Sequence, residues 1–374
     1  MSIQQNNIYM AGANVGDLEV KYVTDALRNG WYESKYYYVE KLEKEFARYH
    51  NRKYAFMTPN CTSAIHLLLA GLGIGKDDEV IIPECTWIAT SVSTIHLGAK
   101  PIFCDIEKDS WCLDPISVRN SITDKTKAII AVDLFGNMAN WEELQKISDE
   151  YNIPLVEDAA EALGSTLNGV KAGKFGIGST FSFHNTKTMT TGEGGMLLID
   201  DDDLYEKCVL LRDLGRGPNT KAYYNEIVAY KFMPFNVQAA LGLAQFERLD
   251  ELIAIQRMHF NYYRTNLKDL DVQFNYEPSN VFNGAWITGM VIGESYNIDK
   301  IKFIDDLQKE GVPSRPFFYP LSSIPAYNLE KEYRDKNKNS YNISRRGINL
   351  PGGANLTEKQ LDTICSGVRK VLTK

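Results

Sequence analysis

The sequence predicts an α/β protein in which a large domain with a doubly covered, mostly parallel sheet precedes a smaller α+β domain. Short apolar runs alternate with helical patterns through the first half of the chain, which is typical of parallel strands covered by helices on both faces. The length of 374 residues exceeds that of one small domain. A long helical pattern begins at Leu249, so we expect the large domain over residues 1–248 and the small domain over 249–374.

Composition and charge exclude several classes of function. The net charge of −7 gives no reason to expect a nucleic acid or an anionic membrane as partner, and no apolar run approaches membrane-spanning length. The N-terminus lacks the basic and apolar regions of a signal peptide. Six cysteines are scattered without a Cys-x-x-Cys pair, so we expect reduced thiols, no metal site and a cytoplasmic location.

The first elements lead to a turn of a kind that can bind anions. Helical patterns cover residues 17–29 and 39–47, and the Trp- and Tyr-rich loop between them could serve packing, a subunit interface or a substrate pocket. A short strand, Tyr54–Met57, is followed by Thr58-Pro-Asn-Cys-Thr-Ser63 and an apolar helix. A strand, a polar turn and a helix start can bind phosphate through free N–H groups and the helix dipole. Ordinary N-capping is the simpler interpretation of this segment taken alone.

Four further strands are expected, at residues 79–82, 101–106, 128–135 and 155–158, with helices at 86–97 and 141–151 among them. Functional residues of parallel sheets gather at the carboxyl ends of the strands. The residues that directly follow a predicted strand include Cys61 to Ser63, Trp87, Asp158 and Lys187. The topology therefore allows them to share one crevice.

Lys187 lies between two apolar strands, Thr180–Phe183 and Met196–Ile199, in a segment rich in hydroxyl and glycine residues. Burying a lysine costs free energy, so a lysine in this place is a poor structural residue. It is well suited to form a Schiff base with a carbonyl compound. Taken alone, a solvated loop lysine is the more common finding, and the other residues of the crevice decide between the two.

The second half of the chain carries helical patterns and two polar-aromatic loops. Helices are expected at residues 204–214, 237–246, 249–267, 299–310 and 358–372, with a strand at 286–291. The segments 315–320 and 349–353 are loop-like. Arg315 is a candidate anion binder, although a surface arginine is the more common finding.

These residues together match the needs of pyridoxal 5'-phosphate (PLP). Its phosphate needs N–H and hydroxyl donors, and its ring needs a flat partner such as Trp87. Its pyridine nitrogen needs a buried carboxylate such as Asp158, and its aldehyde needs an amine such as Lys187. A dinucleotide is less consistent with the sequence, because Gly71-Leu-Gly-Ile-Gly75 lacks the last glycine of the fingerprint and closes a helix instead of opening one.

Six blocks of the sequence carry a family resemblance over nearly the whole chain. They are Thr62–Leu67, Gly73–Pro83, Gly98–Asp105, Glu157–Gly164, Phe181–Lys187 and Gly192–Gly195. In this order the blocks resemble the DegT/DnrJ/EryC1/StrS family of PLP-dependent sugar aminotransferases. The resemblance implies a fold-type I, aspartate aminotransferase-like architecture. It also favours amino transfer over dehydration, since a dehydratase branch of the family has His where Lys187 stands.

The resemblance implies roles for individual residues. Lys187 would bind PLP covalently and then transfer a proton between substrate and cofactor, and Asp158 would pair with the pyridine nitrogen. Glu161 would lie near the ring hydroxyl, and Trp87 would stack on the ring. The phosphate would be held by Thr62, Ser63 and Ser182.

The resemblance further implies a homodimer with active sites at the subunit interface, where Lys231 or Asn236 of the other subunit would complete the phosphate site. Three departures from the family pattern stand out. Cys61 replaces a glycine, Asp133 replaces a common histidine, and the block 231–236 replaces a common motif. The candidate substrate residues are His184, Arg315 and Tyr319.

The expected activity is transfer of the amino group of L-glutamate to the keto carbon of a nucleotide-linked 4-keto-6-deoxy sugar, for O-antigen or capsule biosynthesis. PLP would become pyridoxamine 5'-phosphate during turnover. A smaller keto substrate, such as a ketose or triose phosphate, is an alternative because His184 and the block 231–236 are unusual. A PLP-binding regulatory protein without turnover is a more remote alternative, against which the pair of Lys187 and Asp158 argues.

Overall fold

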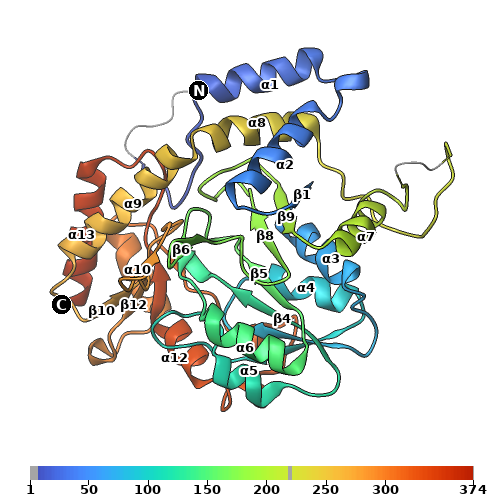
Figure 1. Ribbon diagram of the computed structural model, residues 1–374. Coiled ribbons are helices and arrows are strands. Elements are labelled where there is room, and N and C mark those ends of the chain that lie inside the picture. Colours follow the sequence, from blue (N-terminus) through green and yellow to red (C-terminus); the bar gives the residue numbers. More distant parts are fainter. Residues whose placement is uncertain (1–6, 218–220, 374) are drawn as a thin grey trace.

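A seven-stranded mixed sheet forms the centre of the molecule (Figure 1). The computed structural model describes residues 7–217 and 221–373. The strand order is β1-β9-β8-β5-β4-β2-β3. The strands are β1 (Tyr54–Thr58), β2 (Glu79–Pro83), β3 (Lys100–Cys104), β4 (Thr126–Val132), β5 (Leu155–Asp158), β8 (Gly178–Ser182) and β9 (Gly195–Ile199). Only β9 runs against its neighbours, so the predicted mostly parallel sheet is confirmed.

Apolar side chains on both faces of this sheet explain its near-continuous hydrophobic strands. Ile81 of β2 belongs to the core on one face, whereas Val80 and Ile82 belong to the core on the other. One face is covered by α2 (Tyr37–Tyr49), α5 (Pro115–Ser121), α6 (Trp141–Tyr151) and α8 (Asn236–Glu247). The other is covered by α3 (Cys61–Gly71), α4 (Ala89–His96) and α7 (Asp202–Arg212). The predicted double covering is therefore present, and α1 (Asp17–Asn29) lies outside it beside α8 (Figure 1).

A smaller antiparallel sheet lies in the last third of the chain. Its strand order is β10-β12-β14-β13, with β10 (Val272–Phe274), β12 (Gly289–Ile292), β13 (Arg315–Pro316) and β14 (Gly347–Asn349). The helices α9 (Leu249–Asn266), α10 (Lys300–Lys309) and α13 (Glu358–Leu372) enclose a third core with it. The remaining elements include α11 (Glu330–Tyr333), α12 (Lys338–Arg346) and a small sheet of β6 (Thr166–Leu167), β7 (Val170–Lys171) and β11 (Val281–Phe282).

The domain boundary between residues 248 and 249 stays a proposal. The second sheet lies entirely beyond it, which supports the division. However, Leu249 and Ile253 pack in the core of the large sheet, and so does Leu321 from the later part of the chain. At the other end, Met10 accepts a backbone hydrogen bond from Gly352. The two parts therefore pack closely, with segments of each contributing to the other.

Several expected elements differ in extent from the structure, three of them by three residues at one end. The helix expected over 86–97 begins only at Ala89, so Trp87 lies in the loop before it. The strand expected over 128–135 ends at Val132, where a tight turn begins and Phe135 takes a φ of 55°. The strand expected over 286–291 begins at Gly289. Within the part of the chain that the structure describes, no helix is both long and apolar enough to cross a membrane.

Candidate active site

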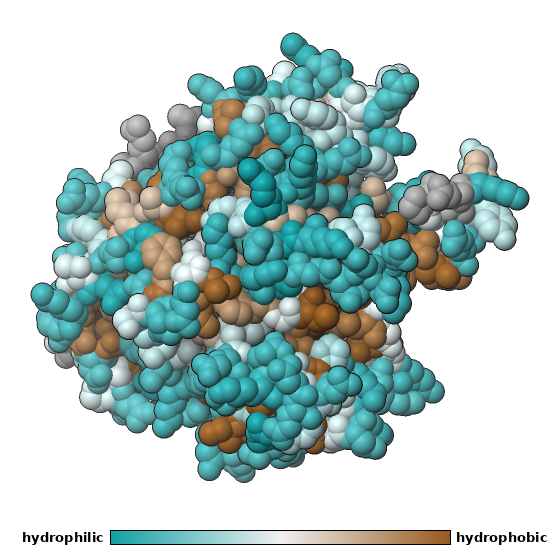
Figure 2. All heavy atoms as spheres, viewed as in Figure 1, coloured by the Kyte–Doolittle hydropathy of each residue, from teal (hydrophilic) through white to brown (hydrophobic). Residues whose placement is uncertain are grey.

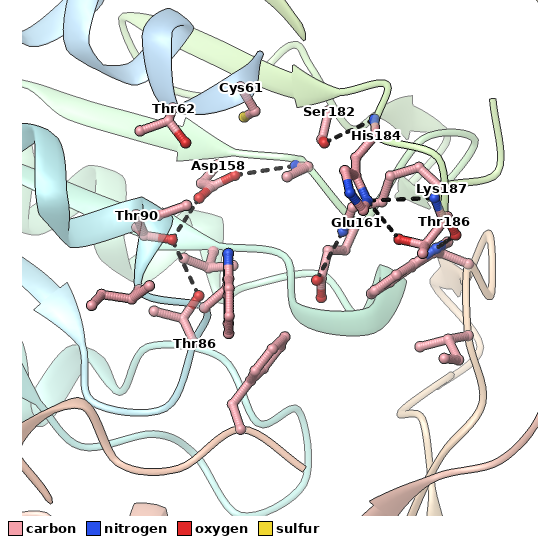
Figure 3. Close-up of a pocket in the computed structure, with 18 of the residues that line it drawn as sticks. Cys61, Thr62, Thr86, Thr90, Asp158, Glu161, Ser182, His184, Thr186 and Lys187 are labelled. Carbon is pink, nitrogen blue, oxygen red and sulfur yellow. Dashed lines mark hydrogen bonds and ion pairs between the residues drawn. The ribbon is translucent and has the colours of Figure 1, made fainter. Parts of the chain in front are cut away.

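A cavity of about 720 Å³ lies between the carboxyl ends of the large sheet's strands and the β13–β14 edge of the small sheet. Nine of the twelve predicted site residues line it: Thr62, Trp87, Asp158, Glu161, Ser182, His184, Lys187, Arg315 and Tyr319. Figure 3 shows the side chains of several of them directed toward one space from α3, β5, β8 and the turn after β8. The strand-end argument from the sequence therefore brought together residues that are distant in the chain.

The Lys187 amine is held between a carboxylate and an aromatic ring. Its Nζ lies 3.0 Å from Oε1 of Glu161 (Figure 3). It also lies 3.5 Å from the centroid of the Trp286 ring. The Trp286 indole N–H donates to the carbonyl of Thr186 at 2.6 Å, which fixes the ring beside the lysine. An amine with two fixed neighbours is presented to the cavity in one orientation, as a nucleophile requires.

Glu161 is itself fixed by the turn after β4. Its second oxygen, Oε2, accepts the backbone N–H of Phe135 at 3.0 Å. Phe135 adopts a left-handed conformation, which costs a residue of this type free energy. That conformation directs its N–H to Glu161, so the turn and the carboxylate together position the lysine.

Asp158, at the end of β5, is a buried carboxyl group with two hydrogen bonds. Oδ2 accepts the Thr90 hydroxyl at 2.8 Å, and Oδ1 accepts the backbone N–H of Ala160 at 3.2 Å. Thr90 is linked in turn to Thr86 (Figure 3). Burial raises the pKa of Asp158 to about 6, with the Thr90 bond acting against this. A cationic donor in the cavity would satisfy the carboxylate and favour its charged form.

The start of α3 is the place where the sequence predicts a phosphate site. The Asn60 side chain accepts the N–H of Ser63 at 2.8 Å and so caps the helix. The N–H groups of Cys61 and Thr62 in the first turn have no acceptor within the helix. The Thr62 side chain and Ser182 from β8 face the same space (Figure 3). Ser63 does not line the cavity, and its backbone N–H is already used by Asn60.

The proposed substrate residues lie around the mouth of the cavity. The His184 Nδ1 is 3.0 Å from the Thr186 hydroxyl, and its Nε2 lies 3.6 Å from Glu193. Arg315 lies in β13 of the small sheet, and Tyr319 follows this strand. Trp87 is 59% exposed, and its ring centroid lies 6.0 Å from that of Phe318. An exposed ring in the cavity that Asp158 also lines can stack on a flat ligand.

Lys231 and Asn236 do not line the cavity of this chain. Asn236 begins α8 and is buried, where its side chain bonds to the backbone of Tyr38, Gly30 and Ser34. Lys231 is exposed and forms an ion pair with Asp213. Both side chains thus have partners within their own chain, and a contact of either one with another subunit stays a prediction.

Sequence reasoning missed several residues of the site. Thr90 contacts Asp158 directly and Thr86 contacts it through Thr90. Their spacing of four within the helix expected over residues 86–97 was a usable signal, although the observed helix begins only at Ala89. Asn60 follows the usual pattern of an N-cap. Trp286 carries no local signal, since it reaches Lys187 only through the folding of a segment about 100 residues away.

The residues present fit PLP. A fixed amine, a buried carboxyl group and the N-terminus of a helix face one cavity. These groups match the aldehyde, the ring nitrogen and the phosphate of the cofactor. The fold and this site together define a PLP-dependent transferase of the α/β class.

Comparison with known proteins leads to the same class of protein. A family model described as the DegT/DnrJ/EryC1/StrS aminotransferase family matches residues 14–369. The chain is 37% identical to a GDP-perosamine synthase of Vibrio cholerae, over 94% of this chain and 95% of that protein. It is 36% identical to a GDP-perosamine synthase of Caulobacter vibrioides, over 98% of both chains.

Solved structures show the same architecture. A protein assigned as a sugar aminotransferase from Streptococcus pneumoniae, solved in its PLP form, superposes with a TM-score of 0.89 at 25% identity. The match covers 98% of this chain and 99% of that one. The protein described here belongs to the DegT/DnrJ/EryC1/StrS aminotransferase family and is a PLP-dependent aminotransferase. The segments 314–320 and 346–351 also resemble GDP-perosamine synthases in particular.

Proposed function

We propose that this protein transfers the amino group of L-glutamate to the keto carbon of a nucleotide-linked 4-keto-6-deoxy sugar, and that the product enters O-antigen or capsule biosynthesis. The observation that carries the proposal is the fixed Lys187 amine in a cavity of about 720 Å³, in a chain that is 37% identical to a GDP-perosamine synthase. A cavity of this size can hold a sugar together with the cofactor.

The residues of this chain have distinct tasks in such a reaction. Bound PLP supplies an electron sink for the carbon that loses or gains a proton. Lys187 binds the cofactor and then moves that proton through its Nζ. Glu161 and the Trp286 ring hold the amine where it can return to the same place after each cycle. Asp158 keeps the ring nitrogen protonated, while Thr62 and Ser182 bind the phosphate.

His184, Arg315 and Tyr319 are the proposed substrate residues, since they line the same cavity around its mouth. Arg315 supplies a cation for an anionic group of the substrate. The relatives' names do not favour the smaller keto substrate. A pure binding role is not favoured either, because a protein that only binds PLP has less need of the positioned Lys187 and Asp158.

The proposal includes a homodimer with active sites at its interface and Lys231 contacting the partner's phosphate site. The segment between α7 and α8 projects from the body (Figure 1), and hydrophobic surface lies beside it (Figure 2). Tyr223 and Val228 in this segment are fully exposed, which is unfavourable unless another subunit covers them. Sedimentation equilibrium should therefore give twice the chain mass of 42.3 kDa, and a monomer at micromolar concentration would contradict the proposed homodimer.

All six cysteines are free and buried, which supports the proposed cytoplasmic location.

The test of the chemistry replaces Lys187 by Ala or Arg. Because Lys187 is the only lysine among the described residues that line the cavity, both variants should lose the absorbance band of lysine-bound PLP. Amino transfer should fall by about 10³-fold or more, the scale of a lost general acid–base group. The exposed Lys146→Ala serves as the matched control. Retained transfer in either Lys187 variant would contradict the assignment.

A further inference from the structure

Lys300 is a buried cation with no carboxylate partner. It is the first residue of α10 and is 3% exposed. Its Nζ donates to the Phe317 carbonyl at 3.1 Å and to the Ser344 hydroxyl at 3.0 Å, and lies 3.8 Å from the centroid of the Tyr319 ring. Among the described residues, no carboxylate lies within ion-pair distance of it. Burial of such a group costs free energy, so we looked for a functional role that explains its position.

The hydrogen bonds of Lys300 fix one wall of the active-site cavity from behind. Phe317, Phe318 and Tyr319 all line that cavity. Lys300 holds the carbonyl of Phe317, and Ser344, which accepts from Lys300, donates in turn to the carbonyl of Phe318 at 2.6 Å. The Cys85 thiol donates to that same carbonyl at 3.2 Å. Two successive peptide groups of the wall therefore depend on one ammonium group and its relay through Ser344.

The wall that Lys300 supports also carries side chains that face the substrate. Arg315 begins it in β13, and Tyr319 ends it with its ring over the ammonium. A cation held against one face of the Tyr319 ring leaves the rest of that side chain, which is 46% exposed, directed to the cavity. A shift of this wall would therefore move two of the three proposed substrate residues together.

We propose that Lys300 is a positioning residue for the keto-sugar acceptor: its ammonium orders the segment from Arg315 to Tyr319 and so sets the affinity of the cavity for a nucleotide-linked sugar. The inference rests on the proposed function and adds a residue that never touches the substrate. It also gives the wall a dependence on pH, because the same contacts weaken when the ammonium loses its proton.

The groups that face Lys300 determine the pH at which its ammonium loses the proton. Asp299 precedes it and caps α10 through the N–H of Ile301. Cys85 stays a neutral thiol, since burial raises its pKa well above the usual range. Burial lowers the pKa of Lys300 to about 8, while the charge of Asp299 acts in the other direction. Acceptor binding should therefore weaken as the pH rises through about 8.

Equilibrium binding of GDP-mannose and dTDP-glucose, stable nucleotide hexoses, to the PLP-loaded protein between pH 6.5 and 9.5 tests this. The better ligand should lose about tenfold in affinity across this range, corresponding to about 1.4 kcal/mol. Lys300→Met should bind the nucleotide hexose about tenfold more weakly than the wild type at low pH, and its affinity should not fall further as the pH rises. Ser344→Ala should also weaken binding of the nucleotide hexose, but its affinity should still fall as the pH rises through about 8. The control Lys302→Met alters an exposed lysine of the same helix and should match the wild type.

A second measurement is independent of ligand and of activity. The unfolded chain keeps the Lys300 proton to a higher pH than the folded chain, so the unfolded state binds more protons above pH 8. The free energy of unfolding should therefore gain a contribution as pH rises from about 8 to 10, and Lys300→Met should lack that contribution. Ser344→Ala should retain it, which keeps the test valid if one variant folds poorly.

The outcomes separate this inference from the proposed function. If the wild type binds neither nucleotide hexose, both fail. If the wild type binds and Lys300→Met follows the same affinity and pH profile, the positioning role alone is overturned. A Lys300→Met protein that is only less stable, with unchanged ligand affinity, identifies a purely structural lysine and also overturns it.

Discussion

At the residue scale, the site depends on which carboxyl groups stay charged. Glu161 has the Lys187 amine as its partner, whereas Asp158 has only neutral donors in this structure. Directly behind them, Asp133 and Glu157 are two fully buried carboxyl groups on neighbouring strand ends. Asp133 also donates its backbone N–H to the carbonyl of Asp158 at 3.1 Å. The buried pair thus supports the strand end that carries Asp158.

This pair predicts a dependence of stability on pH. Burial and the neighbouring Glu157 raise the pKa of Asp133 well above its usual value, and burial raises that of Glu157 to about 7. The folded state therefore holds more protons than the unfolded state above pH 4, so the pair's contribution to stability is lost as pH rises through 7. Asp133→Asn removes one titrating group while keeping an oxygen for the N–H of Ala139 and the Trp141 indole.

Urea denaturation between pH 5 and 8.5 measures the effect. The wild type should lose free energy of unfolding over this range, and Asp133→Asn should reduce the loss by about 1.4 kcal/mol or more, the value of one pKa unit. The exposed Asp124→Asn provides a matched control with the wild-type slope. An identical slope in Asp133→Asn would contradict the assignment of this pair.

Single residues of the site differed in how predictable they were. Asp158 and Lys187 could be found from sequence because each follows a strand and because PLP requires an acid and an amine. Trp286 and Lys300 could not, because their roles arise only from contacts between segments far apart in the chain. The same holds for Asn236, whose buried role in its own chain no local pattern reveals.

At the element scale, the approach of β9 to the start of α3 shapes the phosphate site. Gly195 opens β9 opposite Thr58 and Ser182. A Cβ atom there would lie 2.5 Å from the backbone N of Cys61 and the backbone C of Asn60. Backbone atoms cannot move without a large cost in free energy, so only glycine at this position lets β9 approach the start of α3. The Gly-Glu-Gly-Gly turn thus has a steric purpose beside its place in the motif.

Gly195→Ala should therefore push the first turn of α3 away from β9. We expect a loss of about 1–3 kcal/mol in stability, as for other overpacked sites, together with weaker binding of PLP. Thermal unfolding with and without PLP measures both. Gly75→Ala is the control, because a Cβ at Gly75 meets open space. A Gly195→Ala protein with wild-type stability and PLP affinity would disprove the steric account.

Most elements could be predicted from periodicity, and the exceptions have physical reasons. Strands that are buried on both faces appear in the sequence as apolar runs. Their predicted positions agree with the structure to within a few residues. The start of α4 was placed too early because Trp87 was counted as part of its apolar pattern. The helix α12 was missed since it is almost wholly polar, and it is held by the Asp105 carboxylate, which caps its first turn through Ser340.

At the scale of the whole molecule, two sheets converge on one cavity. The large sheet contributes the groups that fit PLP, and the small sheet contributes the wall that faces the substrate. Buried carboxylates connect the two: Glu84 after β2 accepts from Ser322 and Asn337 of the later segment. Most groups that fit PLP thus come from the large sheet, whereas two of the three proposed substrate residues, Arg315 and Tyr319, come from the later part of the chain.

The most direct test of the central claim follows the cofactor's absorbance through both halves of the reaction. The PLP-loaded protein should lose the band of lysine-bound PLP when L-glutamate is added. A nucleotide-linked 4-keto-6-deoxy sugar should then restore it, at a concentration at least about tenfold lower than dihydroxyacetone phosphate requires, because the nucleotide adds binding energy. Restoration by the triose phosphate at the lower concentration, or no response to L-glutamate, would contradict the account.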